Sequence, residues 1–144
     1  ASFVTCGMPL PICDFYGFGS VEPACVLVWG CNIEETGSAD GMCGHQITRT
    51  LRRGARSIVV DPRKTPGAAK ADLWAQVRPG TDVALALAML HVIIEEKIYD
   101  KEFVEKYTVG FDRLVESVKQ YSPSRAEEIT WVPEKSIREM ARLI

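Results

Sequence analysis

Short apolar runs alternate with helical patterns along the first half of the chain. Ala24 to Trp29 is a continuous apolar run that ends at Gly30, and Ile58 to Val60 is a shorter one. Apolar runs of this length predict buried strands. Between them, Asp40 to Arg53 has apolar or small residues at helical spacing, and Gly54 supplies a C-terminal stop. We therefore predict a β-α-β unit with parallel strands and a right-handed crossover.

A third strand and a long helix follow this unit. Ala71 to Val77 predicts a shorter strand, and Val83 to about Lys97 predicts a helix. Thr81 or Asp82 can cap that helix by accepting hydrogen bonds from backbone N–H groups. Because the helix is apolar almost all round, we expect it to be sandwiched between the sheet and another layer.

The remaining pattern predicts shorter and more polar helices. Asp100 can cap a helix that ends at Lys106, and Phe111 to Gln120 forms another. Pro123 and Pro133 suit the first turns of two more helices.

Glycine and proline punctuate residues 1–23, which predicts an irregular lead-in loop. The whole of residues 1–144 therefore reads as a single α/β domain. Its expected architecture is a Rossmann-like parallel sheet flanked by helices in three layers, with a C-terminal helical flank.

Composition excludes several classes of partner. The chain has 144 residues, and its 17 basic and 19 acidic residues give a net charge of -2. Such a charge supplies no field for nonspecific attraction to nucleic acid or anionic lipid, so we expect no nucleic-acid partner. The longest apolar run, Val83 to Ile94, is too short to span a bilayer and contains His91, so we expect no transmembrane segment.

The beginning of the chain and its cysteines carry two further expectations. There is no initiator Met, and residues 1–20 lack the pattern of a secretory signal, so we expect an excised domain of a larger subunit.

The five cysteines include no C-x-x-C pair, which supports neither a disulfide framework nor a self-contained zinc or iron-sulfur site. We interpret Cys25 and Cys43 as reduced, partly buried thiols.

Polar loops follow all three predicted strands. They are Trp29-Gly-Cys-Asn-Ile-Glu-Glu-Thr36, Asp61-Pro-Arg-Lys-Thr65 and Gly80-Thr-Asp82. The carboxyl ends of parallel strands face the ligand crevice of such a sheet. In the first loop, Gly30 lets the backbone approach a ligand, and the N–H groups that lead into the next helix can bind phosphate. Asp61 can hold ribose hydroxyls, while Arg63 and Thr65 can hold phosphate. The carboxylate of Asp82 can accept two parallel hydrogen bonds from guanine N1–H and N2–H₂, a donor pair that adenine lacks.

Structural interpretations compete with this nucleotide hypothesis. Asp-Pro after a strand is often only a turn, and Pro-Gly-Thr-Asp is often only a turn and a helix cap. The coincidence of all three loops at successive strand ends favours a site. The dinucleotide fingerprint G-x-G-x-x-G is absent, because Gly30 is followed by Gly37, Gly41 and Gly44. An NAD(P)-binding Rossmann domain, with Asp61 on the ribose, and a noncatalytic interaction domain remain the alternatives.

Several motifs together resemble a known family. They are Val26-Leu-Val-Trp-Gly-Cys-Asn32, Gly54-Ala-Arg-Ser-Ile-Val-Val-Asp-Pro-Arg-Lys-Thr65, Ala71-Asp72, Arg78-Pro-Gly-Thr-Asp-Val-Ala-Leu85, Tyr99-Asp-Lys-Glu-Phe103, Tyr121-Ser-Pro123 and Glu128-Ile-Thr130. In this order and spacing they resemble the molybdopterin oxidoreductases. More narrowly, they are similar to the large catalytic subunits of the dimethyl sulfoxide reductase and formate dehydrogenase superfamily. The resemblance covers nearly the whole chain from residue 24 onward.

The resemblance implies binding of one of two molybdopterin guanine dinucleotide moieties that chelate molybdenum or tungsten. Family contacts from the three loops carry over to cofactor-binding positions in this chain. These are Trp29, Gly30, Cys31, Asn32, Glu34, Asp61, Pro62, Arg63, Thr65, Gly80, Thr81 and Asp82.

The resemblance also implies a metal ligand before the first strand. Cys6 lies in a place comparable to the family's Cys, selenocysteine or Ser ligand, and a thiolate suits a soft metal centre. Cys13 is a competitor in the same loop. We interpret His45 and His91 as structural residues on helix faces.

For the parent protein, the resemblance implies a two-electron oxidoreductase that acts on a small molecule, as in anaerobic respiration. Electrons would pass to a [4Fe-4S] cluster outside this fragment and to an iron-sulfur electron-transfer subunit. The separated domain, without the remaining domains of its subunit, should have no turnover. Substrate, metal and compartment stay open, the last being the cytoplasm or export by an upstream twin-arginine signal.

Overall fold

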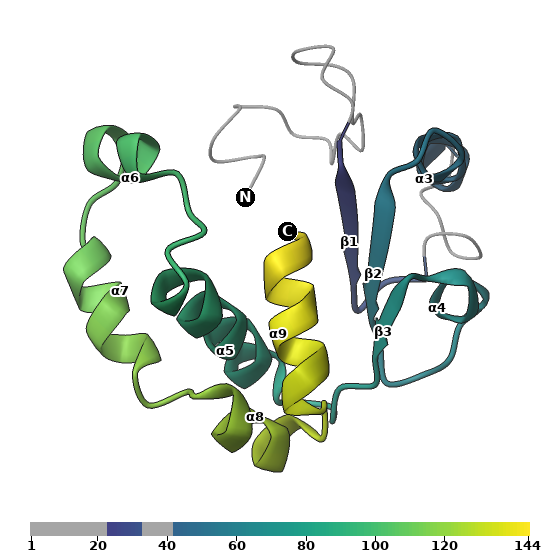
Figure 1. The fold of residues 1–144 in the computed structure, drawn as a ribbon. Coiled ribbons are helices and arrows are strands. Elements are labelled where there is room, and N and C mark those ends of the chain that lie inside the picture. Colours follow the sequence, from purple (N-terminus) through teal and green to yellow (C-terminus); the bar gives the residue numbers. More distant parts are fainter. Residues whose placement is uncertain (1–22, 33–41) are drawn as a thin grey trace.

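A computed structural model of the chain describes residues 23–32 and 42–144, with side chains from Ile47 onward in the second range. Strands and helices alternate at first, and helices follow (Figure 1). The elements are β1 (Cys25–Trp29), α3 (Met42–Arg52), β2 (Arg56–Val60), α4 (Pro66–Lys70), β3 (Leu73–Ala75), α5 (Asp82–Glu95), α6 (Lys101–Tyr107), α7 (Phe111–Val118), α8 (Pro123–Thr130) and α9 (Glu134–Leu143). No helix in this described part is long and apolar enough to cross a membrane.

The strands form one parallel sheet in the order β1-β2-β3. Trp29 pairs with Val60 at the carboxyl end of β1, and Val60 pairs with Ala75 at the carboxyl end of β3. The predicted parallel β-α-β unit is therefore confirmed. Gly54 ends the intervening α3 segment with φ of +101°, a left-handed conformation that glycine adopts without strain.

Helices cover both faces of this sheet, which confirms the predicted three-layer α/β class. In Figure 1, α3 and α4 lie on one side of the strands, and α5 and α9 lie on the other. The period of two along β2 divides its residues accordingly. Ile58 and Val60 point into the main core, whereas Ser57 and Val59 face the side of α3 and α4.

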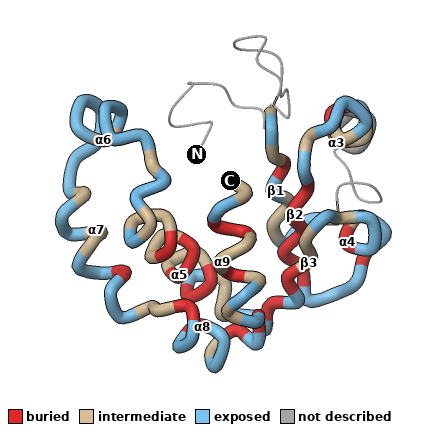
Figure 2. The backbone as a smooth tube through the Cα atoms, in the orientation of Figure 1, coloured by how far each residue is buried: buried red, intermediate tan, exposed pale blue. Residues whose placement is uncertain are grey.

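The main core lies between the sheet and the C-terminal helices. Ile58, Leu85, Ile137 and Met140 are completely buried and belong to one cluster. The buried segments of β2, α5 and α9 face one another across this layer (Figure 2). Helix α5 packs chiefly on α8, α9 and α7. It is thus enclosed mainly by helices and does not lie directly between the sheet and another layer as predicted, while α9 contacts β3.

Three local details differ from the sequence prediction. The third strand ends at Ala75, because the N–H of Val77 bonds back to the carbonyl of Ala75 (3.0 Å) and leaves the ladder. Thr81 does not cap α5 with its side chain, and its hydroxyl donates to the carbonyl of Arg78 instead (2.7 Å). Pro133 precedes the first turn of α9 as its N-cap residue.

The other cap predictions are confirmed. Asp100 accepts a hydrogen bond from the N–H of Phe103 at 2.9 Å and begins α6. Pro123 is in the first turn of α8, after the cap residue Ser122. Helix α4 was not predicted. Its signal is present in Thr65-Pro66, a hydroxyl cap followed by proline at the first helical position.

The amino end of the sheet is pinned by Asp72. Its carboxylate accepts hydrogen bonds from the backbone N–H and hydroxyl of Ser57, at 2.7 and 3.1 Å, and pairs with Arg56 at 2.8 Å. The Ser57 hydroxyl in turn accepts from the Asp72 N–H at 3.1 Å. These backbone and side-chain hydrogen bonds from Ser57, with the charge of Arg56, lower the pKa of Asp72. The contact fixes β2 and β3 side by side at the edge away from the loops.

We expect Leu85→Ala to lower the free energy of unfolding by about 2–5 kcal/mol, because it leaves a cavity in a close-packed core. Leu85 is 0% exposed, whereas Val83 on the same helix is 70% exposed. Urea unfolding of both variants measures the effect. Val83→Ala is the matched control and should stay within about 0.5 kcal/mol of wild type. Equal losses for the two variants would contradict the assigned core.

Asp72→Ala should lower the free energy of unfolding at pH 7. The difference in this free energy between the variant and wild type should become smaller in acid. Because the pKa of folded Asp72 is lowered from 3.8, its stabilisation is present above that value and is lost as pH falls through the folded pKa. Urea midpoints at pH 7 and pH 3 test this. Glu116→Ala, which removes an exposed partner of Lys119, is the control. A gap of constant size at both pH values would refute the linkage.

Candidate nucleotide site at the carboxyl edge of the sheet

The first loop leaves β1 through a left-handed glycine. Gly30 has φ of +60°, and its N–H donates to the carbonyl of Val60 at 2.8 Å. Among the described residues other than its two chain neighbours, no heavy atom lies within 4 Å of where a Cβ of Gly30 would stand. Cys31 is exposed and Asn32 is half-buried at the same edge. The left-handed turn at Gly30 agrees with the conformational freedom that a glycine gives at this position.

The second loop is organised by its own side chains. Asp61 is 2% exposed, and its Oδ1 accepts the N–H of Arg63 at 2.8 Å and lies 3.5 Å from the Arg63 guanidinium. Thr65 is buried, and its hydroxyl caps α4 by accepting the N–H of Ala68 at 3.1 Å. Arg63, with a side chain that is 72% exposed, and its neighbour Lys64 are the exposed cations of this loop. Asp61 and Thr65 thus shape the loop, and these two side chains are open to an anion.

Strand β3 holds this second loop from the side, which the sequence motifs did not indicate. The indole N–H of Trp74 donates to the carbonyl of Asp61 at 3.0 Å, and the Gln76 amide donates to the carbonyl of Pro62 at 3.1 Å. Lys64 lies over the Trp74 ring, 5.6 Å from its centroid. The two hydrogen bonds join residues 13 and 14 positions apart, so no local pattern could reveal them.

The third loop is a tight turn tied to the helical flank. Gly80 has φ of +84°, and the N–H of Thr81 returns to the carbonyl of Arg78 at 3.2 Å. The N–H of Arg78 donates to the carbonyl of Thr130 at 2.9 Å, and its guanidinium stacks 5.1 Å from the centroid of Trp131. The turn between α8 and α9 therefore supports the loop that begins α5.

A side-chain hydrogen bond joins the first loop to the third. The indole N–H of Trp29 donates to Oδ1 of Asp82 at 2.7 Å. Trp29 is the last residue of β1, and Asp82 is the first of α5. The predicted convergence of these two loops is thus real in the structure.

Several predicted positions lie outside the described residues or away from this edge. Cys6, Cys13 and Glu34 are outside the described residues, and so are the side chains of Cys43 and His45. Within the described part, no three His, Cys, Asp or Glu side chains gather as metal ligands. His91 lies on α5, where its Nδ1 is 2.9 Å from the carbonyl of Val118, which matches a structural role.

Cys25 is a free, half-buried thiol at the amino end of β1. Burial and the negative charge of Asp72 raise its pKa, while Arg56 acts in the opposite direction. The thiol is therefore neutral at pH 7. Its free and half-buried state agrees with the expected reduced, partly buried thiol.

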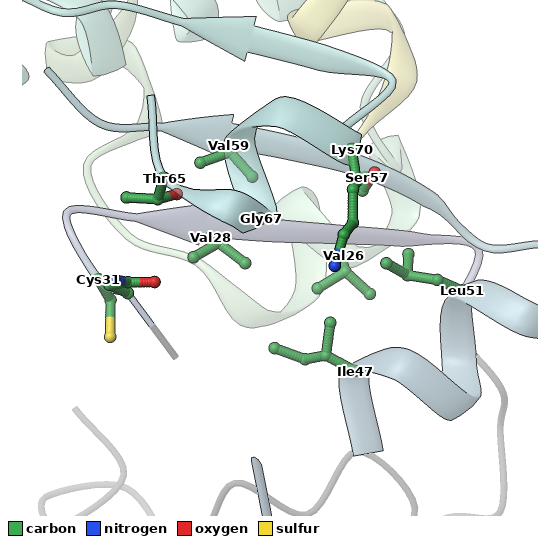
Figure 3. A pocket seen from close by; sticks show the side chains of 11 residues that line it. Val26, Val28, Cys31, Ile47, Leu51, Ser57, Val59, Thr65, Gly67 and Lys70 are labelled. Carbon is green, nitrogen blue, oxygen red and sulfur yellow. The ribbon is translucent and has the colours of Figure 1, made fainter. Parts of the chain in front are cut away.

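A small cavity lies behind the first two loops, between the sheet and α3 and α4. Its volume is about 60 Å³. It is lined by Val26, Val28, Cys31, Asn32, Ile47, Leu51, Ser57, Val59, Thr65, Gly67 and Lys70 (Figure 3). Most of these side chains are apolar, and neither Asp82 nor Arg63 reaches it. The cavity thus lies within the packing of this layer, and three of the predicted cofactor-binding residues, Cys31, Asn32 and Thr65, border it.

The polar groups at the loop edge fit a nucleotide diphosphate. Open backbone at Gly30 and Gly80, an exposed guanidinium at Arg63 and a half-buried carboxylate at Asp82 are the donors and acceptors that it requires. The described residues thus match the nucleotide end of the implied cofactor. The proposed metal ligand, Cys6, falls outside them.

A family model for molybdopterin oxidoreductases matches residues 20–140. Since this is most of the chain, the protein belongs to the molybdopterin oxidoreductase family. Acetylene hydratase of Syntrophotalea acetylenica is 41% identical over 127 residues, which are 88% of this chain and 17% of that protein. The alpha subunit of the F420-dependent formate dehydrogenase of Methanocaldococcus jannaschii is 40% identical over 119 residues, covering 83% and 17%.

The fold is shared with a solved relative. The structure of acetylene hydratase from Pelobacter acetylenicus matches with a TM-score of 0.75 and 40% identity, over 83% of this chain and 16% of that one. The family and fold expected from the sequence are therefore confirmed. The chain spans about a sixth of the length of these relatives, so their complete activities do not follow from it.

Trp74→Phe should loosen the second loop. Without the indole N–H, the carbonyl of Asp61 loses its partner, and we expect the Arg63 amide to exchange about fivefold faster, equivalent to about 1 kcal/mol. Hydrogen exchange followed by NMR measures this rate. Trp131→Phe is the control, since Trp131 is 66% exposed and does not contact this loop through a hydrogen bond in the described residues. An unchanged Arg63 rate in Trp74→Phe would disprove the role of β3.

Proposed function

We propose that this chain binds the guanine dinucleotide end of a molybdopterin cofactor in a larger catalytic subunit. The observation that carries the proposal is the meeting of Trp29 and Asp82 at the edge where Arg63 is exposed. Family membership supplies the cofactor class, a pterin with molybdenum or tungsten. The guanine form is inferred from the chemistry of this edge.

Each loop has a role in this proposal. Main chain of the first loop and the guanidinium of Arg63 bind the diphosphate, because backbone N–H groups and an exposed cation are suitable donors for an anion. Asp82 reads the base by accepting from N1–H and N2–H₂. With Oδ1 of Asp61 held by its own loop, Oδ2 is left for a ribose hydroxyl. Cys31, Asn32, Pro62, Thr65 and Thr81 shape the walls around these contacts.

The bound cofactor would supply the redox chemistry of its metal, with Cys6 as the proposed protein ligand. The chain's own contribution is to anchor the nucleotide away from the metal. We propose that the parent protein is an oxidoreductase with an iron-sulfur domain or subunit that carries electrons. The hydratase among its relatives shows by name that another reaction also occurs in proteins that contain a similar segment.

Binding measurements can test the guanine assignment. Calorimetry on the 144-residue chain, after circular dichroism has verified its folding, should show tighter binding of GDP than of ADP or NAD. Asp82→Asn should weaken GDP about tenfold and improve xanthosine diphosphate, because the amide offers one acceptor and one donor to match xanthine N1–H and C2=O.

Other outcomes select the alternatives. Equal affinity for GDP and ADP would refute the guanine assignment, and tighter NAD binding would select a nicotinamide domain. For a noncatalytic scaffold, Asp61→Ala and Asp82→Ala would leave cofactor loading of the full-length protein unchanged.

A further inference from the structure

The hydrogen bond from Trp29 to Asp82 has the geometry of a positioning contact. It is 2.7 Å long and joins residues 53 positions apart. The Trp29 ring is half-buried and packs against the main core, so the direction of its N–H is set by the fold. Within the part of the chain that the structure describes, Trp29 is the side chain that donates to the Asp82 carboxylate.

The bond restricts a torsion that is otherwise soft. Rotation of an aspartate carboxylate about its terminal torsion is broad and roughly twofold. A donor fixed in a rigid ring holds Oδ1 in place, and the plane of the carboxylate is then defined. A carboxylate has about four lone-pair sites, so one bond from Trp29 leaves both oxygens able to accept from a ligand.

We propose that Trp29 is a positioning residue that gives this site its selectivity for guanine over adenine. The proposal rests on the function proposed above. By fixing the carboxylate plane before binding, Trp29 removes the ordering cost of a two-point contact to guanine. Adenine offers no donor pair to Asp82 and gains nothing from the same constraint. The family resemblance implies that Trp29 contacts the cofactor, whereas the geometry assigns it a role through Asp82.

The test is the ratio of GDP to ADP affinity in Trp29→Phe. Phenylalanine keeps an aromatic ring in the core but lacks the N–H donor. We expect GDP binding to weaken about five- to tenfold, the usual cost of ordering one side chain on binding, with ADP binding unchanged. In an Asp82→Ala background, Trp29→Phe should have no further effect on GDP. Thermal unfolding of each variant verifies that it is folded.

Trp74→Phe is the matched control, since it also removes an indole hydrogen bond at this edge but leaves Asp82 untouched. It should not change the ratio of the two affinities. If Trp29→Phe weakens GDP and ADP equally, or acts additively with Asp82→Ala, the positioning role is wrong even though wild type prefers GDP. If wild type itself has no GDP preference, the proposed function fails first.

Discussion

The parallel pairing of β1 with β2 is the constraint on which the rest of this structure depends. Its register places Trp29 opposite Val60, and the Gly30 N–H continues the pairing for one more bond. Two loops therefore begin side by side at one edge of the sheet. Pairing of β2 with β3 through Ala75 brings the third connection to the same edge. Without this register, the polar groups of the three loops would have no common location.

Burial holds that edge in place. Ile58 and Val60 anchor the central strand in a core shared with α5 and α9, so the strand ends cannot shift relative to the helix that carries Asp82. The Arg78 turn adds a second link, because it bonds to the end of α8. Rigid strands and helices thus hold a site that is built largely from loops, as is usual in α/β proteins.

Polar residues of the candidate site also stabilise the local structure. Asp61 organises its own turn, as the turn interpretation of Asp61-Pro62 expects, whereas the cap that Thr65 gives to α4 was not predicted. These structural roles by themselves explain why Asp61 and Thr65 occur in the loop, and they leave room for ligand contact. The charged side chain of Arg63 is exposed, and the carboxylate of Asp82 accepts a hydrogen bond from Trp29. The proposed function depends most on these two residues.

Local signals were enough to predict most of the elements. The buried strands, the apolar helix α5 and the Asp100 cap each depend on residues close together in sequence, and the ordered motifs identified the family. Helix α4 could also have been predicted from Thr65-Pro66. The tertiary structure alone decided where β3 ends, how Trp74 holds the second loop and that Trp29 meets Asp82. Those outcomes depend on packing and hydrogen bonds between distant residues, which periodicity and spacing along one chain do not encode.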